Sequence, residues 1–79
     1  MSEVVDAERA DDGLTPRERE MVILVAKCMT IKQIALSLHV SEKTVRNHMR
    51  SIYSKLAIYD RSQLVIYALK KGLVDINAL

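Results

Sequence analysis

The chain has 79 residues, enough for one small domain but not for two independent hydrophobic cores. Its residues are 49% apolar and include only two Gly and one Pro, which favours a packed helical fold over disorder and over a β-sheet protein with many turns. A single cysteine excludes an intramolecular disulfide, and no apolar run approaches the ~20 residues of a membrane helix, so we expect a cytoplasmic protein with no membrane partner.

Charge divides the chain into two unlike parts. Residues 1–13 hold five acids and one arginine, a net charge of −4, whereas residues 14–79 hold eleven Lys and Arg and five acids, a net charge of +6. We therefore predict an acidic, flexible leader over 1–13 and a basic folded domain over 14–79. The leader is interpreted as a solubilising tail, with a segment that folds back and competes with a polyanion as the alternative.

The first helix is predicted from its N-terminal signals. Thr15 is suited to be the N-cap, Pro16 to be the first helical residue, and Glu18 to close a capping box. Apolar residues then recur at three- and four-residue steps, at Met21, Leu24, Val25 and Cys28. This period predicts a helix over 16–27 that buries one stripe, with Cys28 as a small core residue.

Two further helices are predicted after short connections. Thr30 and Gln33 repeat the capping box and predict a short helix over 31–38. Ser41 caps a longer helix over about 42–56. The buried stripe of this longer helix is Val45, Met49, Ile52 and Leu56. A short helix, a tight turn and a longer helix form the pattern of a helix-turn-helix.

A fourth helix is predicted to begin after Asp60, where Gln63 allows a third capping box, and to end before Gly72, a typical residue just past a helix. Its core face is predicted to hold Arg61, Leu64, Val65 and Ala68. The side chains left pointing away are Gln63, Ile66, Tyr67 and Lys70. Two large apolar residues exposed together favour a two-fold dimer contact over incidental exposure. The expected fold class is thus all-α, with four helices.

The helix over 42–56 carries the indication of function. Opposite its core stripe lie Lys43, Arg46, Asn47, Arg50 and Ser54, and Glu42 is the only acid on this helix. A helix that is merely solvated usually alternates its charges, so this face favours a polyanionic partner. Arg can donate twice to guanine and Asn can bond twice to adenine in the major groove, which makes double-stranded DNA the preferred partner. An ordinary basic helix and another polyanion are the alternatives.

Ordered blocks of sequence resemble the LuxR/GerE type of helix-turn-helix. The blocks are LTPRERE at 14–20, KQIA at 32–35, SEKTVRNH at 41–48, KL at 55–56 and DRSQ at 60–63. The resemblance covers about residues 14–73 and is closest to GerE-like stand-alone regulators and to the output domains of NarL-type response regulators. It implies a bacterial transcription regulator whose helix over 42–56 enters the major groove and whose last helix forms the homodimer.

The resemblance also implies roles for individual residues. Base reading is expected of Arg46, Asn47 and Arg50. Phosphate binding is expected of Thr30, Lys32, Ser41, Lys43, Thr44 and Lys55. Glu18 and Arg61 are predicted to pair across the first and last helices, with independent solvent-exposed charges as the alternative. The family often has Gly where this chain has Cys28 and Ala57, so a positive φ at either would cost on the order of 1 kcal/mol.

Other functions receive less support from the sequence. His48 lies beside the core stripe and is expected to be packed, with a phosphate contact as the alternative. Cys28, His39 and His48 have no spacing typical of metal ligands. No Gly-rich phosphate loop and no nucleophile–His–acid arrangement can be identified, so we expect no enzyme, cofactor, metal site or small-molecule ligand.

The functional interpretation leaves several alternatives open. The chain is also compatible with the output domain of a longer response regulator, with a sigma-factor region, and with a protein-interaction module that acts on another regulator. RNA polymerase is a further candidate partner.

Overall fold

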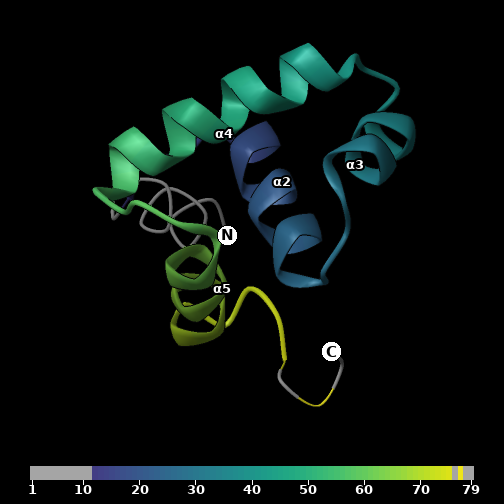
Figure 1. Cartoon of the computed structure of the whole chain (residues 1–79). Coiled ribbons are helices and arrows are strands. Elements are labelled where there is room, and N and C mark those ends of the chain that lie inside the picture. Colours follow the sequence, from purple (N-terminus) through teal and green to yellow (C-terminus); the bar gives the residue numbers. More distant parts are fainter. Residues whose placement is uncertain (1–11, 76, 78–79) are drawn as a thin grey trace, which may run out of the picture.

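Four helices make up the described part of the chain, residues 12–75 and 77, in the computed structural model (Figure 1). They are α2 (Pro16–Ala26), α3 (Ile31–Leu38), α4 (Glu42–Leu56) and α5 (Arg61–Lys70). The predicted all-α fold is confirmed, and α2 ends one residue before its predicted end. Among these residues, no helix is long and apolar enough to cross a membrane. Of the predicted acidic leader, only Asp12 and Gly13 fall within the described residues.

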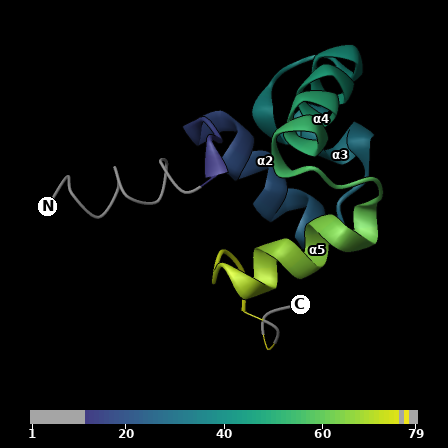
Figure 2. The same ribbon diagram turned by 90° about the vertical axis from the view of Figure 1, so that its left-hand side faces the viewer.

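Helix α2 lies at the centre of the fold. It packs against α5, α4 and α3, and α3 also packs against α4. Figure 1 shows α4 running across one side of the molecule with α2 beneath its middle. Figure 2, turned by 90°, shows α5 on the opposite side of α2 from α4. One long side of α4 therefore faces away from the rest of the protein.

Side-chain caps define where the helices begin. Complete capping boxes close at α2, between Thr15 and Glu18, and at α3, between Thr30 and Gln33. At α5 the carboxylate of Asp60 accepts a hydrogen bond from the Gln63 N–H (2.9 Å). The Gln63 side chain, however, accepts from the Tyr59 N–H and does not close a box on Asp60. The predicted N-caps are thus confirmed at all four helices, including Ser41 at α4, but the third capping box does not close.

All four helices end in the same backbone motif. A residue one or two positions past each helix has a positive φ, namely Cys28 (68°), His39 (59°), Ala57 (54°) and Gly72 (71°). The N–H of the next residue then donates to a carbonyl near the end of the helix, in the pairs Met29–Leu24 (3.2 Å), Val40–Ala35 (3.0 Å), Ile58–Tyr53 (3.1 Å) and Leu73–Ala68 (2.9 Å). This is the Schellman motif, which satisfies carbonyls that a helix leaves open. Three of the four motifs hold a non-glycine residue in a conformation that L-residues disfavour.

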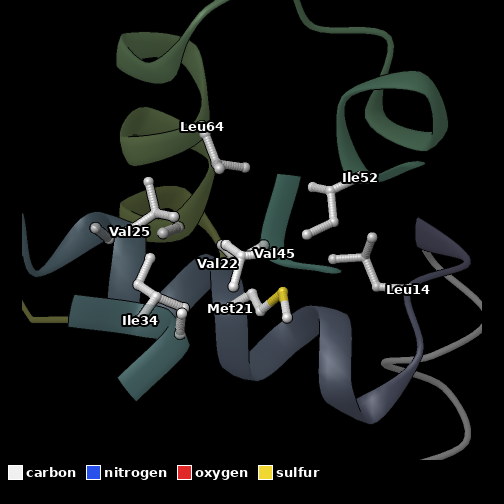
Figure 3. Packing of buried hydrophobic residues seen from close by; sticks show 11 residues of the cluster. Leu14, Met21, Val22, Val25, Ile34, Val45, Ile52 and Leu64 are labelled. Carbon is white, nitrogen blue, oxygen red and sulfur yellow. The ribbon is translucent and has the colours of Figure 1, made fainter. Parts of the chain in front are cut away.

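Buried side chains from all four helices form one hydrophobic core around α2 (Figure 3). Its members, each 5% exposed or less, are Leu14, Met21, Val22, Val25, Ala26, Ile34, Ala35, Val45, Ile52, Leu64 and Ala68. The sequence pattern misses Val22 and Ala26 because α2 is covered on several sides, and it misses Leu14 because this residue precedes the helix. The predicted stripe of α4 is confirmed, with Met49 and Leu56 half-buried at its edges.

Cys28 is exposed, so its predicted role in the core is wrong. The physical reason is the end of α2. The helix stops at Ala26, and the left-handed turn at Cys28 breaks the three- and four-residue period on which the prediction rested. Met29, which follows the turn, packs against the core in its place.

Candidate nucleic-acid interface

The two faces of α4 differ sharply in exposure. Val45 and Ile52 are fully buried in the core. The opposite face is exposed along the helix, at Lys43, Arg46, Asn47, Arg50 and Ser54. The structure therefore brings the three sequence-predicted base-reading residues together on one surface.

The cations of this surface make weak contacts within their own helix. Arg46 Nη2 lies 3.2 Å from Glu42 Oε1, one turn away, and both side chains are about half exposed. Arg50 Nη1 donates to Asn47 Oδ1 at 3.4 Å, also in solvent. Exposed pairs of this kind contribute less than about 1 kcal/mol. The guanidinium groups can consequently leave these partners when a stronger acceptor approaches.

Apart from Lys55, the predicted phosphate-binding residues lie at the starts of α3 and α4. Thr30 and Lys32 lie at the N-terminus of α3, and both are exposed. At α4, Ser41 Oγ accepts from the Thr44 N–H (3.0 Å) and donates to Thr44 Oγ1 (2.9 Å), with Lys43 exposed between them. A helix N-terminus carries a partial positive charge and free N–H groups, which suit a phosphate.

Lys55 belongs to a different environment from the other predicted phosphate ligands. Its Nζ lies 2.7 Å from Glu18 Oε1, and Ser51 Oγ donates to Glu18 Oε2 at 2.9 Å. Burial raises the pKa of the Glu18 carboxyl, but hydrogen bonds from Lys55, from the Thr15 N–H and from Ser51 outweigh it and hold this pKa below its ordinary value. Lys55 thus neutralises a buried carboxylate between α2 and α4, and its predicted phosphate contact would compete with this ion pair.

The predicted pair of Glu18 and Arg61 is wrong. Arg61 Nη2 instead donates to the carbonyl oxygens of Val25 (3.2 Å) and Met29. Glu18 lies in the first turn of α2 and these carbonyls lie at its end, and an 11-residue helix is ~16 Å long. Arg61 therefore caps the C-terminal end of α2, where its charge also complements the helix dipole.

The outward face of α5 is smaller than predicted. Ile66 is 50% exposed, and Gln63 and Lys70 are exposed beside it. Tyr67 is half-buried, and its hydroxyl donates to Asp12 Oδ2, so the prediction that it points away is wrong. The reason is that its partner, Asp12, lies outside α5, so the spacing of residues within the helix does not reveal it.

Asp12 forms a second polar cluster on the inner side of the fold. Its carboxylate accepts from Tyr67, from the Leu14 N–H (3.0 Å) and from Arg19 (3.2 Å), and its side chain is 4% exposed. Burial raises the pKa of Asp12, but these hydrogen bonds together lower it below its ordinary value. Asp12, which the sequence analysis assigned to the leader, is thus part of the packed structure.

His48 is half-buried at the edge of a shallow pocket that also touches Glu18, Thr44, Asn47 and Ser51. Across residues 12–75 and 77, no group of three or more His, Cys, Asp and Glu side chains could hold a metal ion.

A short helix, a tight left-handed turn and a longer, cationic helix on a four-helix core define a helix-turn-helix domain of the DNA-binding class. Residues 12–68 match the family described as "Bacterial regulatory proteins, luxR family", and the chain belongs to this family. Its members are DNA-binding transcription regulators, and this chain is a transcription-regulator domain of that kind.

The chain is similar to the response regulator protein VraR of three staphylococci. The proteins of Staphylococcus aureus (strain Mu3 / ATCC 700698), Staphylococcus saprophyticus subsp. saprophyticus and Staphylococcus epidermidis are each 44% identical to it over 62 residues. The match covers 78% of this chain and 30% of each relative. The chain therefore spans less than a third of the length of these curated relatives.

Proposed function

We propose that this chain recognises a specific promoter or operator sequence by placing α4 in the major groove of double-stranded DNA. The observation that carries the proposal is the exposed face of Arg46, Asn47 and Arg50 on a helix whose other side is anchored in the core. Arg suits the O6 and N7 acceptors of guanine, and Asn suits the N6 and N7 groups of adenine. The core holds the helix in a fixed position, and the guanidinium groups are free to move onto the base edges. Reading bases requires both properties.

Phosphate contacts on either side of the groove hold α4 in register. We assign them to the residues at the starts of α3 and α4, namely Thr30, Lys32, Ser41, Lys43 and Thr44. These groups supply salt-dependent affinity without sequence information. Lys55 is left out because it is bonded to Glu18.

The regulator acts as a homodimer through α5. The support for this is the half-exposed Ile66, flanked by Gln63 and Lys70, on a helix that packs on the far side of α2 from α4. Tyr67 supports the interface from inside, through its bond to Asp12. A two-fold dimer binds an inverted repeat with half-sites one helical turn, ~10 bp, apart.

Within the cell, this domain serves as the output domain of a response regulator in the bacterial cytoplasm. The similarity to proteins named as response regulators supports this role over that of a regulator acting alone. Binding at a promoter then either brings RNA polymerase to the DNA or blocks its access.

The test is selection of the purified chain on a randomised duplex library. We expect enrichment of an inverted repeat, and loss of the enriched sequence for Arg46→Ala and Arg50→Ala. Arg17→Ala is the matched control, because the Arg17 side chain is also about half exposed but lies on α2, outside the α4 face. No enriched sequence, together with negligible binding at low salt, would contradict the proposal and favour a protein-interaction module.

A further inference from the structure

A groove of about 360 Å³ lies beside the cationic face of α4, between that helix, α2, α3 and the start of α5. Five apolar side chains line it, namely Val25, Ile31, Ile34, Met49 and Tyr53. Three arginines complete the lining, namely Arg46, Arg50 and Arg61. Pockets that bind small molecules are commonly of about 300–1,000 Å³, mostly apolar, with a few converging polar groups.

The apolar floor is held in place by the core. Val25 and Ile34 are fully buried members of the core cluster, on α2 and α3 (Figure 3). Ile31, Met49 and Tyr53 are half-buried and pack against the same cluster. Since Val25 and Ile34 are at most 1% exposed, the apolar surface open to a ligand is that of Ile31, Met49 and Tyr53, and contacts with the core hold it in place.

The charge of the lining selects the kind of ligand, because three arginines and no acid face this groove. Arg61 is fixed by its bonds to the Val25 and Met29 carbonyls, both from Nη2, which leaves Nη1 and Nε for another acceptor. Arg46 and Arg50 are held only by exposed contacts on their own helix. A carboxylate at the mouth can pair with any of these guanidinium groups.

We propose that this groove binds a small anionic amphiphile, with its apolar body on the floor and its carboxylate against the arginines. A bare phosphate would leave the apolar floor in water, and a neutral hydrocarbon would leave the arginines unused. The sequence pattern does not reveal this groove, and the sequence analysis expects no small-molecule ligand, because the lining residues come from four separate helices and share no motif. The occupant engages Arg46 and Arg50, so it competes with DNA; this consequence alone rests on the proposed function.

The first test needs no DNA. The ¹⁵N-labelled chain is titrated with 2-naphthoate and, in parallel, with 2-naphthamide, which has the same shape and no charge. We expect saturable shifts of the backbone amide signals of Ile31, Met49 and Tyr53, with naphthoate binding about tenfold more tightly than the amide, the effect of one charge-assisted hydrogen bond. Equal affinities, shifts that cluster elsewhere, or shifts that do not saturate would overturn the proposal.

A pair of variants on α3 provides the matched control. Ile31→Asn removes apolar surface from the groove, whereas Leu36→Asn changes an apolar side chain that is 68% exposed and lies outside it. We expect naphthoate binding to fall about tenfold for Ile31→Asn and to stay unchanged for Leu36→Asn. Equal binding by both variants would overturn the assignment of the floor. If Ile31→Asn does not fold, the acid–amide comparison in the unsubstituted chain still decides the proposal.

The second test measures DNA binding with and without naphthoate at fixed ionic strength. We expect the Kd for the selected duplex to rise in inverse proportion to the fraction of the protein that the titration shows to be unoccupied, and naphthamide at the same concentration to have less effect. Binding in the groove with an unchanged Kd for DNA would overturn the competition and leave the site itself supported. Failure to select any duplex would contradict the proposed function, but it would not affect the conclusion that the titration gives about the groove.

Discussion

Arg46 near the start of α4 and Lys55 near its end each pair with a glutamate, but the two pairs differ in burial. Arg46 and Glu42 meet in solvent at 3.2 Å, with side chains 56% and 45% exposed. Lys55 approaches Glu18 to 2.7 Å, and the Glu18 side chain is only 5% exposed. The first pair is local to one helix, whereas the second joins α4 to α2.

This difference separates the two tasks of one helix. An exposed pair contributes little, so Arg46 can exchange Glu42 for a base edge at small cost. A buried carboxylate that loses its partner is strongly destabilising, so Lys55 is not available for exchange. Cations of the same helix are thus assigned to recognition or to structure by the burial of their partners.

The largest expected effect comes from removing the buried partner. Glu18→Ala deletes the bonds to Lys55, to Ser51 and to the Thr15 N–H, and it should lower the free energy of unfolding by about 3 kcal/mol in denaturant titration. Glu20→Ala is the control, because Glu20 makes only an exposed pair with Arg17 at 3.4 Å, and it should change stability by less than about 0.5 kcal/mol. An equal loss of stability in both variants would contradict the conclusion that the buried pair contributes more than an exposed one.

The same carboxylates predict how stability depends on pH. Folding lowers the pKa of Glu18 and of Asp12, so the stability they contribute is fully present above their unfolded pKa values, 4.5 and 3.8, and is lost as pH falls through the folded values. The free energy of unfolding should therefore fall as pH drops below about 4.5. The fall should be shallower in Glu18→Ala, and an identical pH profile would exclude Glu18 as a source.

The next largest effect is expected at the exposed pair of Arg46 and Glu42. Arg46→Ala should lower affinity for the selected duplex by about 2 kcal/mol relative to random duplex, because under the proposed function the variant loses the two hydrogen bonds that an arginine can donate to a base edge. Thermal unfolding should be almost unchanged, since Arg46 is in solvent. A parallel loss of affinity for random duplex would instead make Arg46 a phosphate ligand.

How much of the fold follows from the sequence depends on how local each signal is. Thr15 and Glu18 form their capping box within four residues, and the stripe of α4 repeats within one helix, so both are predictable. The partner of the Glu18 carboxylate cannot be predicted in this way, because it depends on which end of α4 lies over the first turn of α2. Tyr67 turns inward for the same reason, toward an aspartate that precedes the first described helix.

At two positions the sequence alone could not tell whether a non-glycine residue adopts a positive φ, and the structure shows that it does. Cys28 and Ala57, the two positions at which the family resemblance leads us to expect glycine, both have a positive φ. Ala57→Gly, just beyond Lys55, should raise the free energy of unfolding by about 1 kcal/mol, because Gly adopts this conformation without strain. Gly72→Ala should lower it by a similar amount, since no atom lies within 4 Å of the added Cβ and the backbone alone decides. An unchanged free energy of unfolding in either variant would contradict a cost of positive φ at that position.

The smallest expected effect is the sharpest test of the two classes of cation on α4. Lys43→Met should reduce the slope of log K against log salt by about 1 for each phosphate that the side chain neutralises, with little change in sequence preference. Lys55→Met removes the same charge and should leave this slope unchanged, although it destabilises the fold by leaving Glu18 unpaired. The measurement is a salt titration of DNA binding at a temperature where both variants are folded. An equal fall in slope would mean that Lys55 reaches a phosphate while it holds Glu18, and burial of the partner would then no longer separate recognition from structure.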